Sequence, residues 1–531
     1  MQLRMKHRVQ LGILLFLLIV GSSLLLRQVS FDQSNVYAES PSVLAPLASF
    51  LYYLPAIARA PGPPPPTLTT YDWTQFGFDA RHSGNNNLET WITRGNVSGL
   101  HKLFQITLPS VADGAPVFLS GVSTSSGTHD LVYVTTKAGH IIALDAHTGA
   151  QIWIHQNSGV NYTTSSPAVD PNRQFVYSYG LDGKAHKYAV GDGTETISSS
   201  WPETATLKPS VEKGSSALSI ATTQNITTFL YVANGGYPGD EGDYQGHVTV
   251  INLADGTQKV FNANCSNQVV HFVVAPGTPN CPAVQTAIWA RPGVIYDSDT
   301  NMIYMATGNG NYAPASHNWG DTVFALHPDG TGANGNPIDT YTPADFELLQ
   351  NADADLGSTA PAVLPPSSGK YSHLAVQSGK DRMLRLLNLD NLSGQNGIGH
   401  TGGEVFIMGM PNGGGVYTAP AVWVDPSDNS TWVFVANGYD SGLAGFQLLI
   451  DGAGNPSLAT RWTHAGGTSP IVANGILFYA TSGSVHALDP TNGNELWSNN
   501  QIGSIHWESP IVASGILYVT DESAHLTAYS R

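Results

Sequence analysis

Five side chains in the middle of the sequence belong to types that take part in cofactor, metal and proton chemistry. An aromatic face can stack on a flat ring, side-chain oxygens suit calcium, and a carboxylate can remove the proton of an alcohol. Each type also has an ordinary use, in sheet packing, a turn, a loop or helix cap, or a solvated loop. The five residues are Trp289, Asn309, Asp345, Lys380 and Glu241. Whether they act together depends on the fold that positions them.

Several other classes of chemistry leave no trace in the sequence. It contains no zinc-ligand spacing, no haem-attachment motif and no glycine pattern of a phosphate-binding loop. The net charge of −17 is the opposite of the clustered positive charge that a nucleic-acid backbone requires. We therefore expect no nucleic-acid partner.

One short pattern occurs twice, far apart in the chain. "HIIALDAHTGAQIW" (140–153) returns as "SVHALDPTNGNELW" (484–497). In both copies an alternating apolar run gives way to Asp, small polar residues and Gly, and a second run ends on Trp, which is typical of a β-hairpin. Trp153 and Trp497 are large apolar anchors suited to packing one hairpin sheet against its neighbour.

Each hairpin follows a strand that opens with a small residue and usually Pro, and more divergent copies of this order fill the chain between them. Eight such units begin at Ala115, Ser166, Ser215, Ala290, Ala360, Ala419, Ser469 and Ser509. The 56 glycines, 33 prolines and 11% of charged residues also favour many short strands joined by turns. The sequence therefore predicts an all-β fold, an eight-bladed β-propeller with a four-stranded sheet in each blade.

The last unit has only three strands before the chain ends, which would leave an open sheet edge. "HKLFQITL" (101–108) is strand-like, lies before the first unit, and carries Phe104 where other outer strands carry Trp. We predict that this N-terminal strand completes the last blade and closes the ring.

The N-terminus differs in character from the rest of the chain. Basic residues precede an apolar run from 11 to 26, which is typical of a signal peptide or a signal anchor within residues 1–38. Residues 39–70 include "APGPPPP" and predict a stiff proline-rich stalk, with a disordered leader as the alternative. The propeller is expected over 71–531, in an extracytoplasmic protein that contacts a membrane only through its N-terminus. The sequence leaves open whether the leader is cleaved.

The chain has two cysteines, Cys265 and Cys281, in a loop-like stretch. In an exported protein they are expected to form a disulfide that staples a long surface loop, with two free thiols as the alternative.

The repeat resembles that of a known family. Its consensus, Asp-Gly-x-hydrophobic-Ala-Leu-Asp-x-x-Thr-Gly-x-x-x-Trp, is similar to the blade repeat of pyrroloquinoline quinone (PQQ) propeller proteins, and "WTQFGFDARHSGNNNLE" (73–89) is similar to the N-terminal segment of their exported bacterial members. The resemblance covers about residues 71–531 and implies the eight-bladed quinoprotein type of propeller.

The resemblance also implies roles for the five side chains. Trp289 and Asn309 match the quinoprotein dehydrogenase residues that floor the cofactor and bind calcium, and Asp345, in "TPAD", matches the catalytic Asp. Lys380 matches the residue that contacts the quinone oxygens, and Glu241 is a poor match to the calcium-binding Glu.

Two functions remain open at this point. The first is a PQQ- and calcium-dependent dehydrogenase that acts on a small-molecule alcohol or sugar. The second is a non-catalytic scaffold of the cell envelope that binds a protein or a polysaccharide through its loops. The chain departs from the dehydrogenase pattern because it has no adjacent cysteines and no cytochrome motif.

Overall fold

The structure is a computed structural model that describes residues 70–411, 413–437 and 442–531. The predicted leader, 1–38, and all but the last residue of the predicted stalk, 39–70, lie outside the described residues. None of the helices in the described part of the chain has the length and apolar character needed to span a bilayer.

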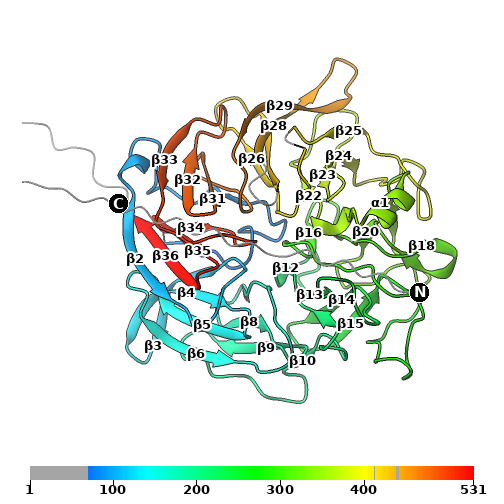
Figure 1. Cartoon of the computed structure of the whole chain (residues 1–531), viewed down its shortest axis with the longest axis horizontal. Coiled ribbons are helices and arrows are strands. Elements are labelled where there is room, and N and C mark those ends of the chain that lie inside the picture. The colour runs from blue at the N-terminus through cyan, green and yellow to red at the C-terminus, as the bar shows by residue number, and fades with distance from the viewer. Residues whose placement is uncertain (1–69, 412, 438–441) are drawn as a thin grey trace, which may run out of the picture. The chain divides into compact units, whose positions relative to one another are not determined.

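Eight four-stranded antiparallel sheets follow one another around a ring, which confirms the predicted eight-bladed propeller (Figure 1). Blades one to four consist of β3(Val117–Thr124), β4(Gly127–Thr135), β5(His140–Asp145) and β6(Gln151–Gln156); β7(Ala168–Val169), β8(Phe175–Tyr179), β9(Lys184–Ala189) and β10(Glu203–Thr204); β12(Ser219–Thr222), β13(Thr228–Gly236), β14(His247–Asn252) and β15(Gln258–Asn262); and β16(Ile295–Asp297), β17(Met302–Ala306), β20(Val323–Leu326) and β21(Asp339–Tyr341).

Blades five to eight repeat this order. They consist of β22(Ala362–Val363), β23(Leu374–Ser378), β24(Met383–Asn388) and β25(Phe406–Gly409); β26(Ala421–Val424), β27(Thr431–Asn437), β28(Gly442–Ile450) and β29(Pro456–His464); β30(Ile471–Ala473), β31(Ile476–Thr481), β32(Ser484–Leu488) and β33(Glu495–Asn499); and β34(Ile511–Ala513), β35(Ile516–Thr520), β36(His525–Ser530) and β2(His101–Thr107).

The shorter elements lie between or beside the blades. They are β1(Asn85–Asn86), which pairs with β30, β11(Glu212–Lys213), which pairs with β13, the pair β18(Tyr312–Ala313) and β19(Asn318–Trp319), the helix α1(Phe346–Ala352), and the 3-10 turns η1(Val97–Gly99), η2(Pro314–Ser316) and η3(Leu356–Ser358).

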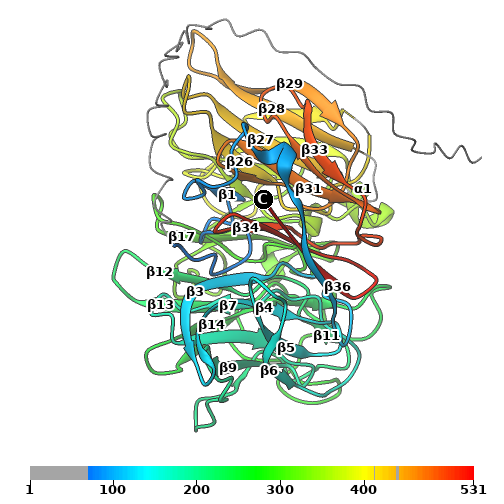
Figure 2. The same ribbon diagram turned by 90° about the vertical axis from the view of Figure 1, so that its left-hand side faces the viewer.

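The N-terminal strand closes the ring as predicted. β2 pairs antiparallel with β36, the last strand of the chain, with Phe104 opposite Ala528 (Figures 1 and 2). This pairing covers the edge that the three C-terminal strands would leave open. Residues 101–107 and the last strand of the chain are thus held in one sheet.

The repeated hairpin explains how neighbouring blades pack. Trp153 on β6 donates a hydrogen bond from Nε1 to the carbonyl of Val190 in the next blade, at 3.0 Å. A Cβ added to Gly193, in that next blade's turn, would lie 2.6 Å from the Trp153 ring. Gly193 also has a φ of +71°, which favours glycine. The Gly of one hairpin therefore seats the aromatic residue of the preceding blade.

Phe104 packs the last blade against the first, as Trp153 packs the first blade against the second. Its ring would lie 2.9 Å from a Cβ at Gly149, in the hairpin turn of blade one. Apolar side chains of adjacent blades also pack against one another, and the cluster across the closure includes Phe118, Tyr518 and Tyr529.

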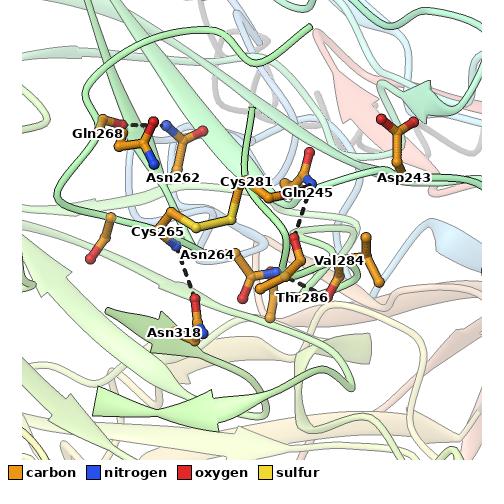
Figure 3. Close-up of a disulfide and its surroundings, with 12 residues drawn as sticks. Asp243, Gln245, Asn262, Asn264, Cys265, Gln268, Cys281, Val284, Thr286 and Asn318 are labelled. Atoms are coloured by element: carbon orange, nitrogen blue, oxygen red, sulfur yellow. Dashed lines mark hydrogen bonds between the residues drawn. A yellow bond between two sulfur atoms is a disulfide. The ribbon is translucent and has the colours of Figure 1, made fainter. Parts of the chain in front are cut away.

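The predicted disulfide joins Cys265 and Cys281, whose Cα atoms are 6.1 Å apart, in the connection between blades three and four (Figure 3). The loop that it closes is tied to residues after β13. Gln245 donates from Nε2 to the carbonyls of Cys281 and Ala283, at 3.2 and 2.9 Å, and Asp243 accepts the Ala275 N–H at 2.8 Å. The disulfide loop therefore supports the 237–245 loop, which reaches the site described next.

Candidate functional site

A cavity of about 530 Å³ is lined by residues from five of the eight blades or the segments that enter them. They come from two places in each repeat, the segment that enters the first strand and the turn between the second and third strands. Because strands alternate in direction in an antiparallel blade, these two places lie at the same end of the sheet. The propeller therefore gathers side chains that are far apart in sequence at one end of the ring.

Aromatic rings form one wall of the cavity. Trp289 precedes β16, Tyr417 precedes β26 and Trp507 precedes β34. The Trp289 ring centroid lies 6.2 Å from that of Tyr417 and 5.8 Å from that of Trp507. All three side chains are partly exposed, so flat apolar faces remain accessible to a ligand.

Lys380, in the turn between β23 and β24, lies against this wall and pairs with two carboxylates. Its Nζ is 5.3 Å from the Trp289 ring centroid, 2.7 Å from Asp355 and 3.0 Å from Asp353. Burial alone would lower the pKa of Lys380, but the charges of Asp355 and then Asp353 outweigh it and raise that pKa. The lysine is held in its charged form at the cavity wall.

Asp355 is the most enclosed acid of the cavity, with an exposed side-chain fraction of 5%. It accepts the backbone N–H of Asn309 at 2.6 Å, and Gly308 brings the chain so close that an added Cβ would lie 2.9 Å from Oδ1. Burial raises the pKa of Asp355 and the Lys380 ion pair opposes this effect, with a net rise above the ordinary value. A carboxylate with a raised pKa and an open side toward a cavity is suited to take up a proton.

The second acidic group of the cavity comes from the loop after β13. Asp240 accepts a hydrogen bond from the Asn309 amide at 3.3 Å and from the Tyr244 hydroxyl at 2.6 Å. Asn309 and Asp240 together offer oxygen atoms of the kind that calcium prefers. Their contact brings blades three and four to one potential cation site.

Comparisons with known proteins agree with this architecture. The family profile described as glucose/ethanol/alcohol dehydrogenase, beta-propeller domain, matches residues 73–184, and the profile of outer membrane protein assembly factor BamB matches residues 449–531. The search of curated protein sequences gave no match.

The solved structures to which the chain is similar include three dehydrogenases. A europium-containing methanol dehydrogenase has a TM-score of 0.61 at 14% identity, over 87% of this chain and 98% of the other. The quinohemoprotein alcohol dehydrogenase ADHIIG from Pseudomonas putida HK5 has a TM-score of 0.60 at 14% identity, over 86% and 80% of the two chains. The quinohemoprotein alcohol dehydrogenase from Comamonas testosteroni has a TM-score of 0.58 at 14% identity, also over 86% and 80%.

The chain is a PQQ-like β-propeller that resembles the quinoprotein dehydrogenases. At this identity the structural similarity concerns the fold, so the chemistry of the site rests on the residues themselves.

The PQQ-like propeller brings three of the five predicted site residues into one cavity. Trp289, Asn309 and Lys380 line it together. Glu241 is exposed and does not line the cavity, whereas its neighbour Asp240 does. Asp345 lies in a separate groove between the outer strands of blades four and five, at the position that precedes α1.

The reason for the displacement of Asp345 is the helix that follows it. Asp345 comes after β21, an outer strand, and α1 then leads the chain to Asp353 and Asp355 at the cavity. The motif "TPAD" resembles that of a catalytic segment. The acids that reach the cavity are instead Asp353 and Asp355, in "DADLG" (353–357).

Several cavity residues were not identified from the sequence, although the repeat contains the signal that locates them. Trp289, Tyr417 and Trp507 each stand three residues before the proline that opens a first strand. Lys213 occupies the same position in the unit that has Ser216 instead of proline. Since repeats superpose around the ring, residues that share this position converge on one end of it.

Proposed function

We propose that this propeller is a quinoprotein-type dehydrogenase, which binds PQQ and calcium in the 530 Å³ cavity and oxidises an alcohol or a sugar. The observation that carries the proposal is the ion pair of Lys380 with the buried Asp355, next to Trp289. It combines a base, a fixed positive charge and an aromatic face.

The residues of the cavity fit both groups. A volume of 530 Å³ lies within the range of about 300–1,000 Å³ that small-molecule cofactor sites span. The indole of Trp289 would lie against the face of the planar ring system, and the oxygens of Asn309 and Asp240 would bind the cation. When bound, PQQ supplies a quinone that accepts two electrons and calcium supplies a Lewis acid.

In this proposal Asp355 is the base, in place of Asp345. Asp355 would accept the hydroxyl proton of the substrate, since its carboxylate is buried and its pKa is raised toward neutrality by that burial. Lys380 would hold the Asp355 carboxylate in its ionised form and direct a positive charge toward the cavity. The N–H of Asn309 would keep Oδ1 of Asp355 in place.

The test is a titration of the purified protein with PQQ and calcium, followed by dye reduction on a panel of alcohols and sugars. A lanthanide is included as a second cation, because one structural relative is described as europium-containing. We expect Asp355→Asn to abolish turnover and keep PQQ binding, and Asp345→Asn, the matched control from the outer groove, to keep both. Equal loss of turnover in the two variants would contradict the assignment.

The alternative is a binding platform of the cell envelope for a protein or polysaccharide, which the BamB profile match over residues 449–531 favours. Absence of PQQ binding by the intact propeller, together with capture of one specific envelope partner, would support that role over the enzyme.

We further propose an extracytoplasmic location, on the basis of the basic and apolar start of the sequence. Fractionation of cells that express a C-terminal reporter fusion tests it, and reporter activity confined to the cytoplasm would contradict it.

A further inference from the structure

The cavity contains a second lysine that the proposed reaction does not use. Lys213, on β11, lines the cavity and has an exposed fraction of 2%. Its Nζ lies 4.5 Å from the Tyr162 ring centroid and 6.0 Å from that of Trp507. Within the described part of the chain no carboxylate lies within 4.0 Å of this ammonium, in contrast to most buried lysines, which are paired.

The two lysines lie near different rings of the aromatic wall. Lys380 is near Trp289, Trp289 contacts Trp507, and Trp507 is near Lys213. The Lys380 end is neutralised by Asp355 and a second carboxylate, and the Lys213 end has neither. The wall is therefore electrically asymmetric.

A second buried cation strengthens this asymmetry. The Cζ of Arg291 lies 5.3 Å from the Trp507 ring centroid, and the side chain has an exposed fraction of 2%. Its guanidinium donates to the backbone carbonyls of Asp113 and Thr164, both at 2.7 Å, and these neutral acceptors leave its charge in place.

The carboxylates of Asp113 and Glu522, near this end of the wall, form ion pairs with residues other than Lys213. Asp113 pairs with Lys137 at 3.3 Å and with His506 at 2.9 Å, and Lys137 also pairs with Glu522 at 2.9 Å. Asp113, His506 and Glu522 are close enough to hold a cation, but the Lys137 ammonium already bonds two of them. Burial and then the charge of Asp113 raise the pKa of Glu508 well above its usual range, which favours its neutral form.

The local balance of charge affects Lys213 itself. Burial, followed by the positive charge of Arg291, lowers the pKa of Lys213 to about 7, while Asp113 opposes the shift and Lys137 adds to it. The nearby phenols carry no charge at this pH, because burial raises the pKa of Tyr162 and brings that of Tyr237 to about 12. An anion that entered this end would meet the Lys213 amine, which has no carboxylate within 4.0 Å in the described part of the chain.

We propose that Lys213 forms a carboxylate-binding subsite at the Trp507 end of the cavity, which takes a planar aromatic ligand with a carboxylate at that end and binds a proton together with it. The inference deepens the proposed function, because it rests on the assignment of this cavity to a planar ligand. The ligand would lie along the tryptophan wall, with its carboxylate on Lys213 and its other end near Lys380.

The test uses three probes that separate charge from quinone chemistry. Naphthalene-2,6-dicarboxylate has the carboxylates without a quinone, the trimethyl ester of PQQ has the quinone without the charges, and PQQ has both. Each is titrated calorimetrically into the wild type, Lys213→Met and Lys187→Met. Lys187 is a matched control because it lies over two aromatic rings, at 4.1 and 5.3 Å, outside this cavity.

We expect Lys213→Met to bind the dicarboxylate and PQQ about 10- to 100-fold more weakly, as for loss of a charged hydrogen bond, and to bind the ester with unchanged affinity. Lys187→Met should match the wild type with all three probes. Between pH 7 and 9 the wild-type affinity for the dicarboxylate should fall by up to about tenfold per pH unit, because the proton must be taken up on binding. Titrations in two buffers of different ionisation enthalpy should count about one proton at the upper end of this range, and Lys213→Met should show none.

The outcomes distinguish this subsite from the proposed reaction. Lys213-dependent binding of the dicarboxylate without PQQ turnover would support the subsite and overturn the dehydrogenase. PQQ turnover with unchanged affinities in Lys213→Met would support the dehydrogenase and overturn the subsite. No binding of the dicarboxylate or PQQ to the folded wild type at about 1 mM, the weakest class of specific affinity, would overturn the subsite.

Discussion

Replacement of Lys380 by Met should reveal how strongly the candidate base depends on its ion pair. The contact with Asp353 is largely solvated, since that side chain is 66% exposed, and contributes about 0.2–1 kcal/mol. The contact with Asp355 is enclosed, with exposed fractions of 18% and 5%. Loss of Lys380 leaves a buried carboxylate without its partner, which costs about 3–5 kcal/mol of unfolding free energy.

A double-mutant cycle with Asp355→Asn separates this effect from the loss of the lysine stem. The variant Asp355→Asn removes the charge that needs Lys380, so the Lys380→Met substitution should cost much less in its presence. We expect a coupling free energy of about 2–3 kcal/mol from urea unfolding of the four proteins. A value near zero would refute the reasoning that the pair is energetically coupled.

The same cycle predicts the sign of a pH effect. Burial raises the pKa of Asp355 in the folded state, so the folded protein binds this proton more tightly than the unfolded chain does. At neutral pH the buried carboxylate is therefore a cost to the free energy of unfolding. Lys380→Met raises that pKa further, so the stability deficit of the variant should shrink as the pH falls from 7 to 5, by at most about 1.4 kcal/mol per pH unit. A deficit that stays constant over this range, or that grows on acidification, would contradict the role given to Lys380.

Three further predictions concern the scaffold. Replacement of both Cys265 and Cys281 by Ser should cost about 3 kcal/mol of unfolding free energy for a sequence separation of 16, and should weaken calcium binding measured by calorimetry, because the closed loop supports the acidic loop of the cavity. Phe104→Ala should lower stability by about 2–4 kcal/mol and unfold the ring at its closure, seen as lost hydrogen-exchange protection of the last strand. Gly193→Ala should cost more than about 1 kcal/mol beyond Gly483→Ala, because both have positive φ but only Gly193 faces a Trp ring; equal melting temperatures of these two variants would contradict the packing argument.

The fold could be predicted in detail because the residues that are repeated in the sequence are those that shape each hairpin and pack it against its neighbour. At three joints the Gly of one hairpin turn lies against the aromatic residue of the preceding blade, namely Phe104, Trp153 and Trp462, so the repeated residues are those that the packing of neighbouring blades needs. The closure of the ring could be predicted in the same way, because a last blade of three strands needs a fourth strand with an aromatic residue. The strand 101–107 supplies this residue as Phe104, which lies opposite Ala528.

The site was harder to predict because its residues lie outside the strands that carry the repeat. Trp289, Asn309 and Lys380 stood out through local motifs, and the structure places them in one cavity. Glu241 stood out in an acidic loop whose neighbouring residue, Asp240, is the one at the cavity. A one-residue shift in a loop reverses which side chain faces the ring, and no pattern in the sequence fixes that choice.

The position three residues before each opening proline offers a physical rule for the remaining residues. It places Trp289, Tyr417 and Trp507 on the cavity wall, and Lys213 at its end, although these side chains share neither size nor charge. In a ring of repeats, position determines where a residue lies, whereas residue type determines what it can do there. The other four units have Asp113, Thr164, Ser358 and Gly467 at this position, so the repeat itself requires neither an aromatic ring nor a charge there. The burial of Lys213 without a carboxylate within 4.0 Å, in the part of the chain that the structure describes, is then best explained by a ligand that brings the missing charge.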